Sequence, residues 1–163
     1  MKRSWSVFLL LSVLFVLFMG GKPKEQKNLN YRITEQGSNI ALRERSPSIT
    51  VFTDEGDFNA FYRYLHMNKI PIPEPPEIDF SRSLLLFVSY GEQRTAGYSI
   101  EIRKVYERNG TLVVQAVLLG PPGESLIAQV ITTPYLLMTV SREHYRRVEL
   151  VGEIGEVLAQ KKL

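Results

Sequence analysis

The fold is decided by residues 98–119, which read YSIEIRKVYERNGTLVVQAVLL. The pair Asn109-Gly110 separates two runs rich in β-branched and apolar residues, and this is a strong short-range signal for a β-hairpin. The apolar alternation of the first run slips by one position at Val105, which predicts a β-bulge near residues 103–104. The two runs are therefore expected to pair as antiparallel strands.

The segments before this hairpin predict one helix and two strands. Residues 54–67 are expected to be helical, because apolar side chains recur there at the spacing of one helical face and Asp54 suits the N-cap. Residues 49–52 are β-prone. Residues 83–90 are apolar on both faces, as in a strand at the middle of a fold. The prolines of the connector 70–77 exclude a helix or a central strand there.

The segments after the hairpin predict further short strands. Residues 127–131 and 135–140 are expected to form two of them, and a last edge strand is expected around Val148 and Leu150, followed by a polar tail. The sum is a mainly β (α+β) domain over residues 49–163. We expect an antiparallel β-sandwich or curved sheet of six to seven strands with one covering helix.

The N-terminus reads as an export signal. Residues 1–21 combine Lys2 and Arg3 with an apolar run from Trp5 to Met19, the pattern of a signal peptide or an uncleaved signal anchor. Residues 22–48 are mostly polar and predict a tether. The domain is therefore expected to be exported: secreted, periplasmic, or anchored to the outer side of the cytoplasmic membrane.

Composition excludes several classes of function. The 163 residues contain no cysteine and two histidines, so disulfides, thiolate catalysis and Cys- or His-rich metal sites are excluded. Apart from Lys2 and Arg3, basic and acidic residues are nearly balanced, which argues against nucleic-acid binding. We expect no metal, no cofactor, and contact with a membrane only through the N-terminal segment if it is not cleaved.

No pattern points to catalysis. Ser125 lacks the glycines of a nucleophile elbow. The carboxylates before and after the predicted helix have simpler explanations as charges at a helix N-terminus and in solvated loops. We therefore expect a protein that is not an enzyme, and keep a secreted hydrolase using Ser125 or paired carboxylates as the least favoured alternative.

Three loops rich in glycine, proline and aromatic residues are the candidate binding elements, because binding residues concentrate on loops of a rigid scaffold. They are residues 91–98, 120–124 and 132–135. The candidate partner-binding residues are Thr95, Ala96, Gly97, Tyr98, Pro121, Pro122, Gly123, Thr133, Pro134 and Tyr135. Tyr98 and Tyr135 are the expected aromatic anchors.

These loops also carry a resemblance. The region from Val51 to about Arg142 resembles the PrcB C-terminal domain family of protease complex subunits. The resemblance rests on Ile78-Asp79-Phe80-Ser81, Thr95-Ala96-Gly97-Tyr98-Ser99-Ile100, Gly120-Pro121-Pro122 and Ala128-Gln129-Val130-Ile131-Thr132-Thr133-Pro134-Tyr135. The loop Thr95-Ala96-Gly97-Tyr98 is also similar to a binding loop of chagasin-type cysteine-protease inhibitors.

The resemblance implies a non-catalytic, exported domain that associates with a protease and modulates or stabilises it. A structural envelope protein without a protease partner is the alternative. The basic residues Arg142, His144, Arg146 and Arg147 suit either contact with acidic lipid or another polyanion, or the solvated face of an edge strand, which is the simpler interpretation.

Overall fold

The hairpin predicted from Asn109-Gly110 is present. It joins β5 (Ser99–Arg108) to β6 (Thr111–Leu119). Asn109 and Gly110 have φ values of 54° and 75°, as a two-residue turn between right-twisted strands requires. The register shifts between Ile102 and Lys104, which confirms the bulge.

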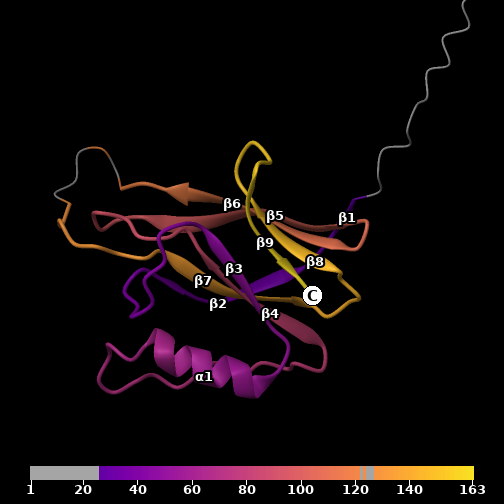
Figure 1. Cartoon of the computed structure of the whole chain (residues 1–163), viewed down its shortest axis with the longest axis horizontal. Helices are drawn as coiled ribbons and strands as arrows, with labels where there is room; N and C mark the ends of the chain where they lie inside the picture. Colours follow the sequence, from indigo (N-terminus) through magenta and orange to yellow (C-terminus); the bar gives the residue numbers. More distant parts are fainter. Residues whose placement is uncertain (1–25, 122, 124–126) are drawn as a thin grey trace, which may run out of the picture.

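The computed structural model describes residues 26–121, 123 and 127–163, and in it this hairpin lies within a β-sandwich (Figure 1). The five-stranded sheet has the order β1-β5-β6-β8-β9, with β1 (Lys27–Asn28), β8 (Arg147–Val151) and β9 (Val157–Lys162). The four-stranded sheet has the order β2-β7-β4-β3, with β2 (Tyr31–Gly37), β7 (Tyr135–Ser141), β4 (Ser83–Ser89) and β3 (Ser48–Phe52). The predicted mainly β sandwich is confirmed, with nine strands in the described residues instead of six to seven.

β4 is apolar on both faces because both of its faces are covered. Leu84, Leu86 and Val88 point into the core between the two sheets. Leu85 and Phe87 point to the opposite face and pack in a second cluster under the helix. The expectation of a strand in the middle of the fold is therefore confirmed.

The helix α1 (Glu55–Leu65) covers the outer face of the four-stranded sheet (Figure 1). It begins where predicted, since the Asp54 carboxylate accepts a hydrogen bond of 2.9 Å from the Asp57 backbone N–H. Phe58, Tyr62 and Leu65 are buried against the sheet. In the described residues no helix is both long and apolar enough to span a membrane.

The prediction of a tether over residues 22–48 is wrong for the described residues 26–48. β1 pairs with β5 and β2 pairs with β7, so the sandwich begins well before residue 49. β2 is an edge strand whose side chains are mostly exposed or half-buried, and it is held by its backbone ladder. Its polar sequence therefore lacked the alternation that marks a half-buried strand.

The C-terminal predictions need two corrections. β8 is not an edge strand, because it lies between β6, to which it is parallel, and β9. The C-terminal residues expected to form a polar tail instead contain β9, which is an edge strand of the five-stranded sheet. Residues 127–131 do not form a strand and belong to the loop before β7.

Candidate functional site

Four segments, which belong to three connections between strands, meet at the end of the sandwich opposite the start of β1, on the left in Figure 1. We call this surface the loop end, and define it by four segments of described residues: 38–47, 90–98, 120–121 with 123, and 127–134. Three of the four are the loops singled out from the sequence. Pro122 is the one candidate binding residue that lies outside the described residues.

The loop before β5 and the loop before β7 are bonded to each other. Gln93 and Thr132 exchange backbone hydrogen bonds of 2.7 and 3.0 Å. The Ala96 backbone N–H donates to the carbonyl of Ala128 at 3.0 Å, and the Thr132 hydroxyl donates to the carbonyl of Thr95 at 3.0 Å. These bonds take the place of a regular strand in residues 127–131.

Gly97 brings the loop before β5 into contact with Pro121, at the start of the connection that leads from β6 to β7. Its φ is +91°, and a Cβ built there would lie 2.7 Å from the Cβ of Pro121. Glycine is therefore required both by the backbone conformation and by the close approach of Pro121. Tyr98, which is half-buried, lies against Gly120.

The remaining connection, residues 38–47, was missed because its sequence was interpreted as part of a tether. Gly91 has a φ of +78°, and a Cβ there would lie 2.9 Å from the backbone nitrogen of Ser46. The Glu92 N–H donates to the carbonyl of Glu44 at 2.6 Å, and the Thr133 N–H donates to that of Ser38 at 2.9 Å. In the sequence, these close backbone contacts are indicated only by the presence of Gly91 and Gly97.

Tyr135 is not a surface residue. Its side chain is 3% exposed and stacks on Phe87 with 6.0 Å between ring centroids. Its hydroxyl donates to the carboxylate of Glu35 on β2, which also accepts a hydrogen bond of 2.8 Å from Tyr62. Thr133 and Pro134 are buried as well. These residues fix the position of the loop and do not offer their side chains to a partner.

Burial sets the electrostatics around Glu35. Desolvation and the hydrogen bonds to Glu35 raise the pKa of both Tyr62 and Tyr135, so both remain neutral donors. His66 is fully buried, with its Nε2 3.0 Å from the Glu35 carboxylate but without a well-aligned hydrogen bond in the described structure. Burial lowers the pKa of His66, against the opposing effect of Glu35. Because His66 is fully buried, a substrate cannot reach its ring. We therefore interpret the cluster around Glu35 as a polar network that stabilises the fold.

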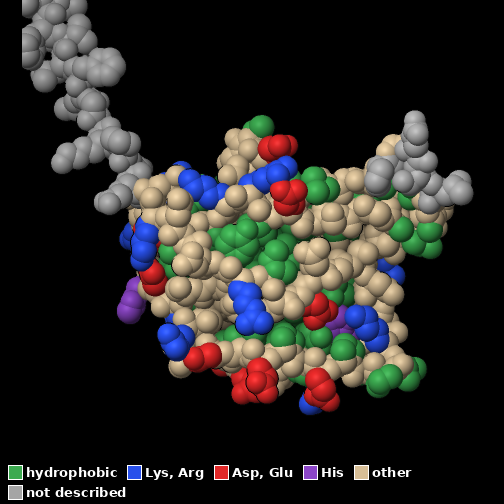
Figure 2. Space-filling model, turned by 180° about the vertical axis from the view of Figure 1, so that it is seen from behind, with side chains coloured by type: hydrophobic (Ala, Val, Ile, Leu, Met, Phe, Trp, Pro, Cys, Tyr) green, Lys and Arg blue, Asp and Glu red, His purple; other side chains and the backbone are tan. Residues whose placement is uncertain are grey.

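The loop end and the adjoining last residue of β6 expose apolar side chains. Leu119, Val130 and Ile131 are 39%, 51% and 59% exposed. Figure 2 shows hydrophobic side chains at this end of the molecule, on the right, and others over the middle of the face. A hollow of about 300 Å³ lies beside them, lined by Arg45, Glu92, Gln93, Arg94 and Ile131. An exposed apolar patch with a charged rim is typical of surfaces that bind other proteins.

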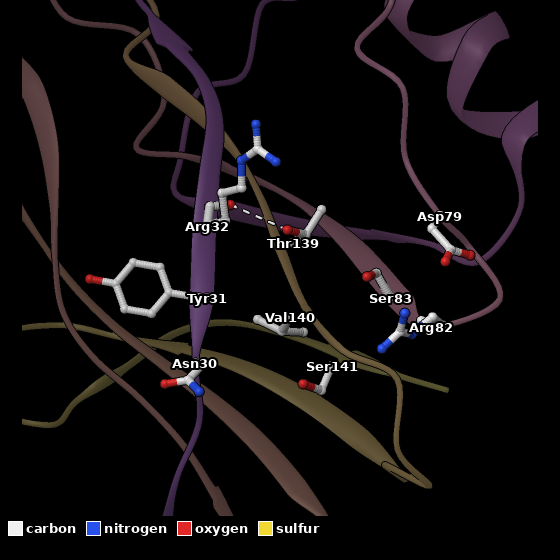
Figure 3. Close-up of a pocket in the computed structure, with 9 residues that line it drawn as sticks. All are labelled: Asn30, Tyr31, Arg32, Asp79, Arg82, Ser83, Thr139, Val140 and Ser141. Atoms are coloured by element: carbon white, nitrogen blue, oxygen red, sulfur yellow. Dashed lines mark hydrogen bonds between the residues drawn. The ribbon is translucent and has the colours of Figure 1, made fainter.

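A second, larger hollow lies on the outer face of the four-stranded sheet beyond the helix (Figure 3). It measures about 440 Å³, and its lining includes Arg32, Asp79, Arg82 and Thr139. Asp79 accepts hydrogen bonds from the backbone and hydroxyl of Ser81, which lower its pKa. This carboxylate therefore stabilises its own turn, and the shallow hollow brings together none of the predicted site residues.

The structure describes only some of the residues weighed for hydrolysis. Ser125 lies outside the described residues. Asp54 is the helix N-cap and Asp79 stabilises a turn, so two of the carboxylates around the helix have local roles. The described residues contain no group of three His, Cys, Asp or Glu side chains placed to hold a metal ion.

Residues 84–141 match the model of the family described as PrcB C-terminal. The match runs from β4 to the end of β7, so it contains three of the four segments of the loop end. The resemblance to this family is thereby confirmed, while the similarity of residues 95–98 to chagasin-type inhibitors stays a prediction. No curated protein and no solved structure matches the chain.

Proposed function

We propose, from the premise that residues 84–141 carry a PrcB C-terminal domain, that this protein is a non-catalytic binding domain of an exported protease complex. The loop end is the surface that contacts the protease. The binding modulates or stabilises the protease and supplies no catalytic group.

One observation carries the proposal: the loop end is rigid and yet leaves apolar side chains exposed. The connections are joined by backbone hydrogen bonds and by the contact of Gly97 with Pro121. A surface held in this way loses little conformational entropy on binding. Val130 and Ile131 are exposed on this base, where burial by a partner would gain roughly 25 cal/mol per Å² of apolar area.

The role of Tyr98 follows from its position. It is half-buried against Gly120, so one part of the ring is fixed while the rest is open to solvent. Tyrosines held in this way are frequent among the residues that dominate binding energy. Tyr98 is therefore the aromatic anchor of the proposal, and Tyr135 is the buried residue that holds the neighbouring loop.

Export is part of the proposal, and its support comes from residues 1–21. Two basic residues precede an apolar run there, as in a signal peptide or a signal anchor. A domain placed outside the cytoplasm in this way would meet proteases that are exported or embedded in the envelope.

The test is retention of a protease by the full chain and by two matched variants. The chain would be immobilised and exposed to native membrane and secreted fractions, and retained proteins would be identified by mass spectrometry. The loop-end variant is V130S/I131S, and the control is I154S/V157S, which changes two exposed apolar residues of the β8–β9 region.

We expect wild type and the control to retain a protease whose peptidase activity changes when the domain is added, and the loop-end variant to lose it. Retention of envelope components without a protease would favour the structural alternative. Equal retention of the protease by all three proteins would show that the loop end is not the binding surface.

A further inference from the structure

The end of the sandwich opposite the loop end is basic. We call it the basic end, and define it by the cations Lys27, Arg108, Arg146, Arg147, Lys161 and Lys162. All six are exposed. Figure 2 shows Lys and Arg side chains on this side of the molecule.

Strand register brings these cations together from segments far apart in the sequence. Arg108 pairs with Thr111 across the hairpin, Thr111 pairs with Arg147 on β8, and Arg147 pairs with Lys162 on β9. The row therefore crosses four strands of one sheet. A hollow of about 340 Å³ lies here, lined by Asn109, Thr111, Arg146, Arg147 and Lys162.

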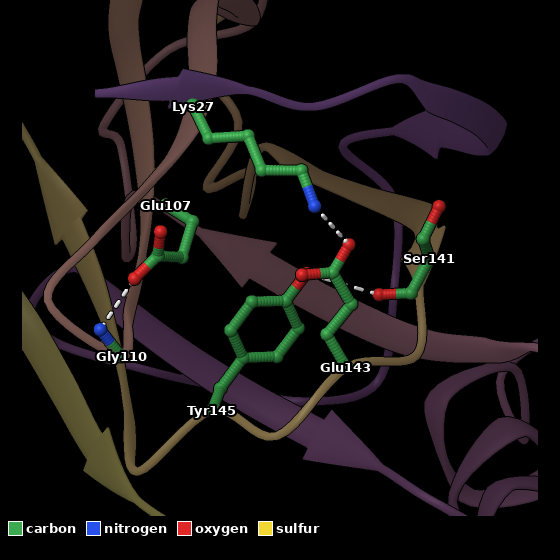
Figure 4. Close-up of polar contacts among 6 residues, drawn as sticks. All are labelled: Lys27, Glu107, Gly110, Ser141, Glu143 and Tyr145. Atoms are coloured by element: carbon green, nitrogen blue, oxygen red, sulfur yellow. Dashed lines mark hydrogen bonds and ion pairs between the residues drawn. The ribbon is translucent and has the colours of Figure 1, made fainter. Parts of the chain in front are cut away.

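The carboxylates near this end are already engaged (Figure 4). Glu107 accepts a hydrogen bond from the Gly110 backbone N–H, and Glu143 pairs with Lys27 at 2.7 Å. The mostly buried Glu149 lies 3.3 Å from Arg147. Within the described part of the chain, Arg108, Lys161 and Lys162 form no ion pair, so their charge is available to an anionic partner.

The fold also overturns the simpler interpretation of the basic residues. Charges at residues 142–147 were expected to protect an edge strand, but β8 is paired on both sides. Arg142 has a local role instead, because its guanidinium donates to the carbonyls of Thr53 and Phe80 at 3.0 and 2.6 Å. Arg146 donates to the carbonyl of Asn109 at 2.7 Å and Arg147 pairs with Glu149, and neither lies on an edge strand.

The described chain begins beside this end. The Lys104 ammonium donates to the Gln26 side chain at 3.0 Å, and Lys27 is opposite Glu107 in the ladder. The apolar run of residues 5–19 ends seven positions before Gln26. A chain of that length spans at most about 25 Å. An N-terminal segment inserted in a bilayer would therefore keep the basic end close to the lipid headgroups.

We propose that the basic end docks on a bilayer containing anionic phospholipid, with lipid phosphates against Arg108, Arg146, Arg147 and Lys162. The proposal rests on the export proposed above, with residues 1–21 kept as an uncleaved signal anchor. Each Lys or Arg near an anionic surface stabilises binding by about fivefold, and the attraction extends only about 10 Å at moderate salt. Docking in this orientation points the loop end away from the membrane, toward the protease.

The absence of cysteine allows a direct test on the full chain. A spin label on H144C reports on the basic end, and a label on A128C reports on the loop end; both positions are exposed. The labelled chain would be placed in nanodiscs of phosphatidylcholine, or in nanodiscs with about one third phosphatidylglycerol. Accessibility to a water-soluble relaxation agent would be measured at both sites.

The charge variant is R108Q/K161Q/K162Q, which removes three unpaired cations. Its matched control is R45Q/R63Q/R94Q, which removes three exposed cations away from the basic end and also without an ion pair in the described structure. We expect the label at residue 144 to be shielded only in anionic nanodiscs. The charge variant should lower the ratio of docked to undocked protein by about 100-fold, and the control should leave it unchanged.

Equal accessibility at residue 144 in both lipids would overturn the proposal, as would equal losses in the two triple variants. Failure of the full chain to enter nanodiscs would show that residues 1–21 are not a membrane anchor, and would overturn the docking proposal as well. Stronger release by inorganic phosphate than by chloride at equal ionic strength would indicate a site for free anions, and would also overturn it. Protease retention by V130S/I131S is measured separately, so the two proposals fail independently.

Discussion

The hydroxyl of Tyr135 donates a hydrogen bond to the carboxylate of Glu35, which lies one hundred residues earlier in the chain. This bond joins the first residue of β7 to the edge strand β2. Because Tyr62 of the helix donates to the same carboxylate, Glu35 links both sides of the second apolar cluster. The loop before Tyr135 is thereby fixed at one of its ends.

Replacing Glu35 is therefore expected to destabilise the domain more than replacing one of its donors. E35A leaves two buried hydroxyls without their acceptor, and should lower the free energy of unfolding by about 2–3 kcal/mol. Y135F removes one donor and should lower it by about 1 kcal/mol. Urea unfolding followed by circular dichroism would measure both. A smaller effect for E35A than for Y135F would show that Glu35 is not the centre of the network.

His66 should make the stability of the domain depend on pH. Its pKa is lowered from 6.5 by burial, so the unfolded chain binds a proton more readily than the folded one. Stability is then complete above pH 6.5 and is lost as the pH falls through and below that value. The charged and titratable groups that act on the ring are Glu35, Tyr62, Tyr135 and Lys69.

The measurement is the free energy of unfolding of wild type and H66F between neutral and mildly acidic pH. Phenylalanine keeps an aromatic ring against Tyr62 and does not titrate. We expect wild type to lose more stability than H66F on acidification, because only wild type carries the imidazole of His66. The titratable groups elsewhere in the domain are the same in both proteins. Parallel pH profiles would mean that His66 titrates alike in the folded and unfolded states.

The local elements of this fold could be predicted because each carries its own signal. The hairpin followed from Asn109-Gly110, and the helix from its N-cap Asp54 and its apolar face. β2 and β9 could not be predicted, because edge strands held mainly by backbone hydrogen bonds need no apolar alternation. For the same reason the range of the tether was overestimated.

The candidate site was predicted in its parts but not in its arrangement. The glycines and prolines of the loops indicated turns, and the glycines indicated positions where another segment can approach the backbone closely. The sequence did not show that Gly97 meets Pro121 of the same chain. Tyr98 and Tyr135 follow similar loop motifs, and only tertiary packing against Glu35 and Phe87 distinguishes the buried tyrosine from the half-exposed one.

Gly97 should tolerate no larger residue. G97A introduces a Cβ at a φ of +91° and 2.7 Å from the Cβ of Pro121, so it should cost about 2–3 kcal/mol and weaken protease retention. G155A is the matched control, since Gly155 has a φ of +87° but open space around it, and should cost about 1 kcal/mol. Equal costs in thermal or urea unfolding would mean that backbone strain alone acts and that the Pro121 contact contributes nothing.

The two tyrosines should separate binding from folding. Y98A removes a half-buried ring at the loop end, so we expect the domain to keep its fold while its affinity for the retained protease falls about 10-fold or more. Y135A removes a ring that is 3% exposed together with its bond to Glu35, and should cost about 3–5 kcal/mol of stability. Circular dichroism and urea unfolding would report the fold, and surface plasmon resonance against the purified protease would report the affinity. A Y98A variant that unfolds would place Tyr98 in the core, and one that binds as tightly as wild type would remove it from the interface.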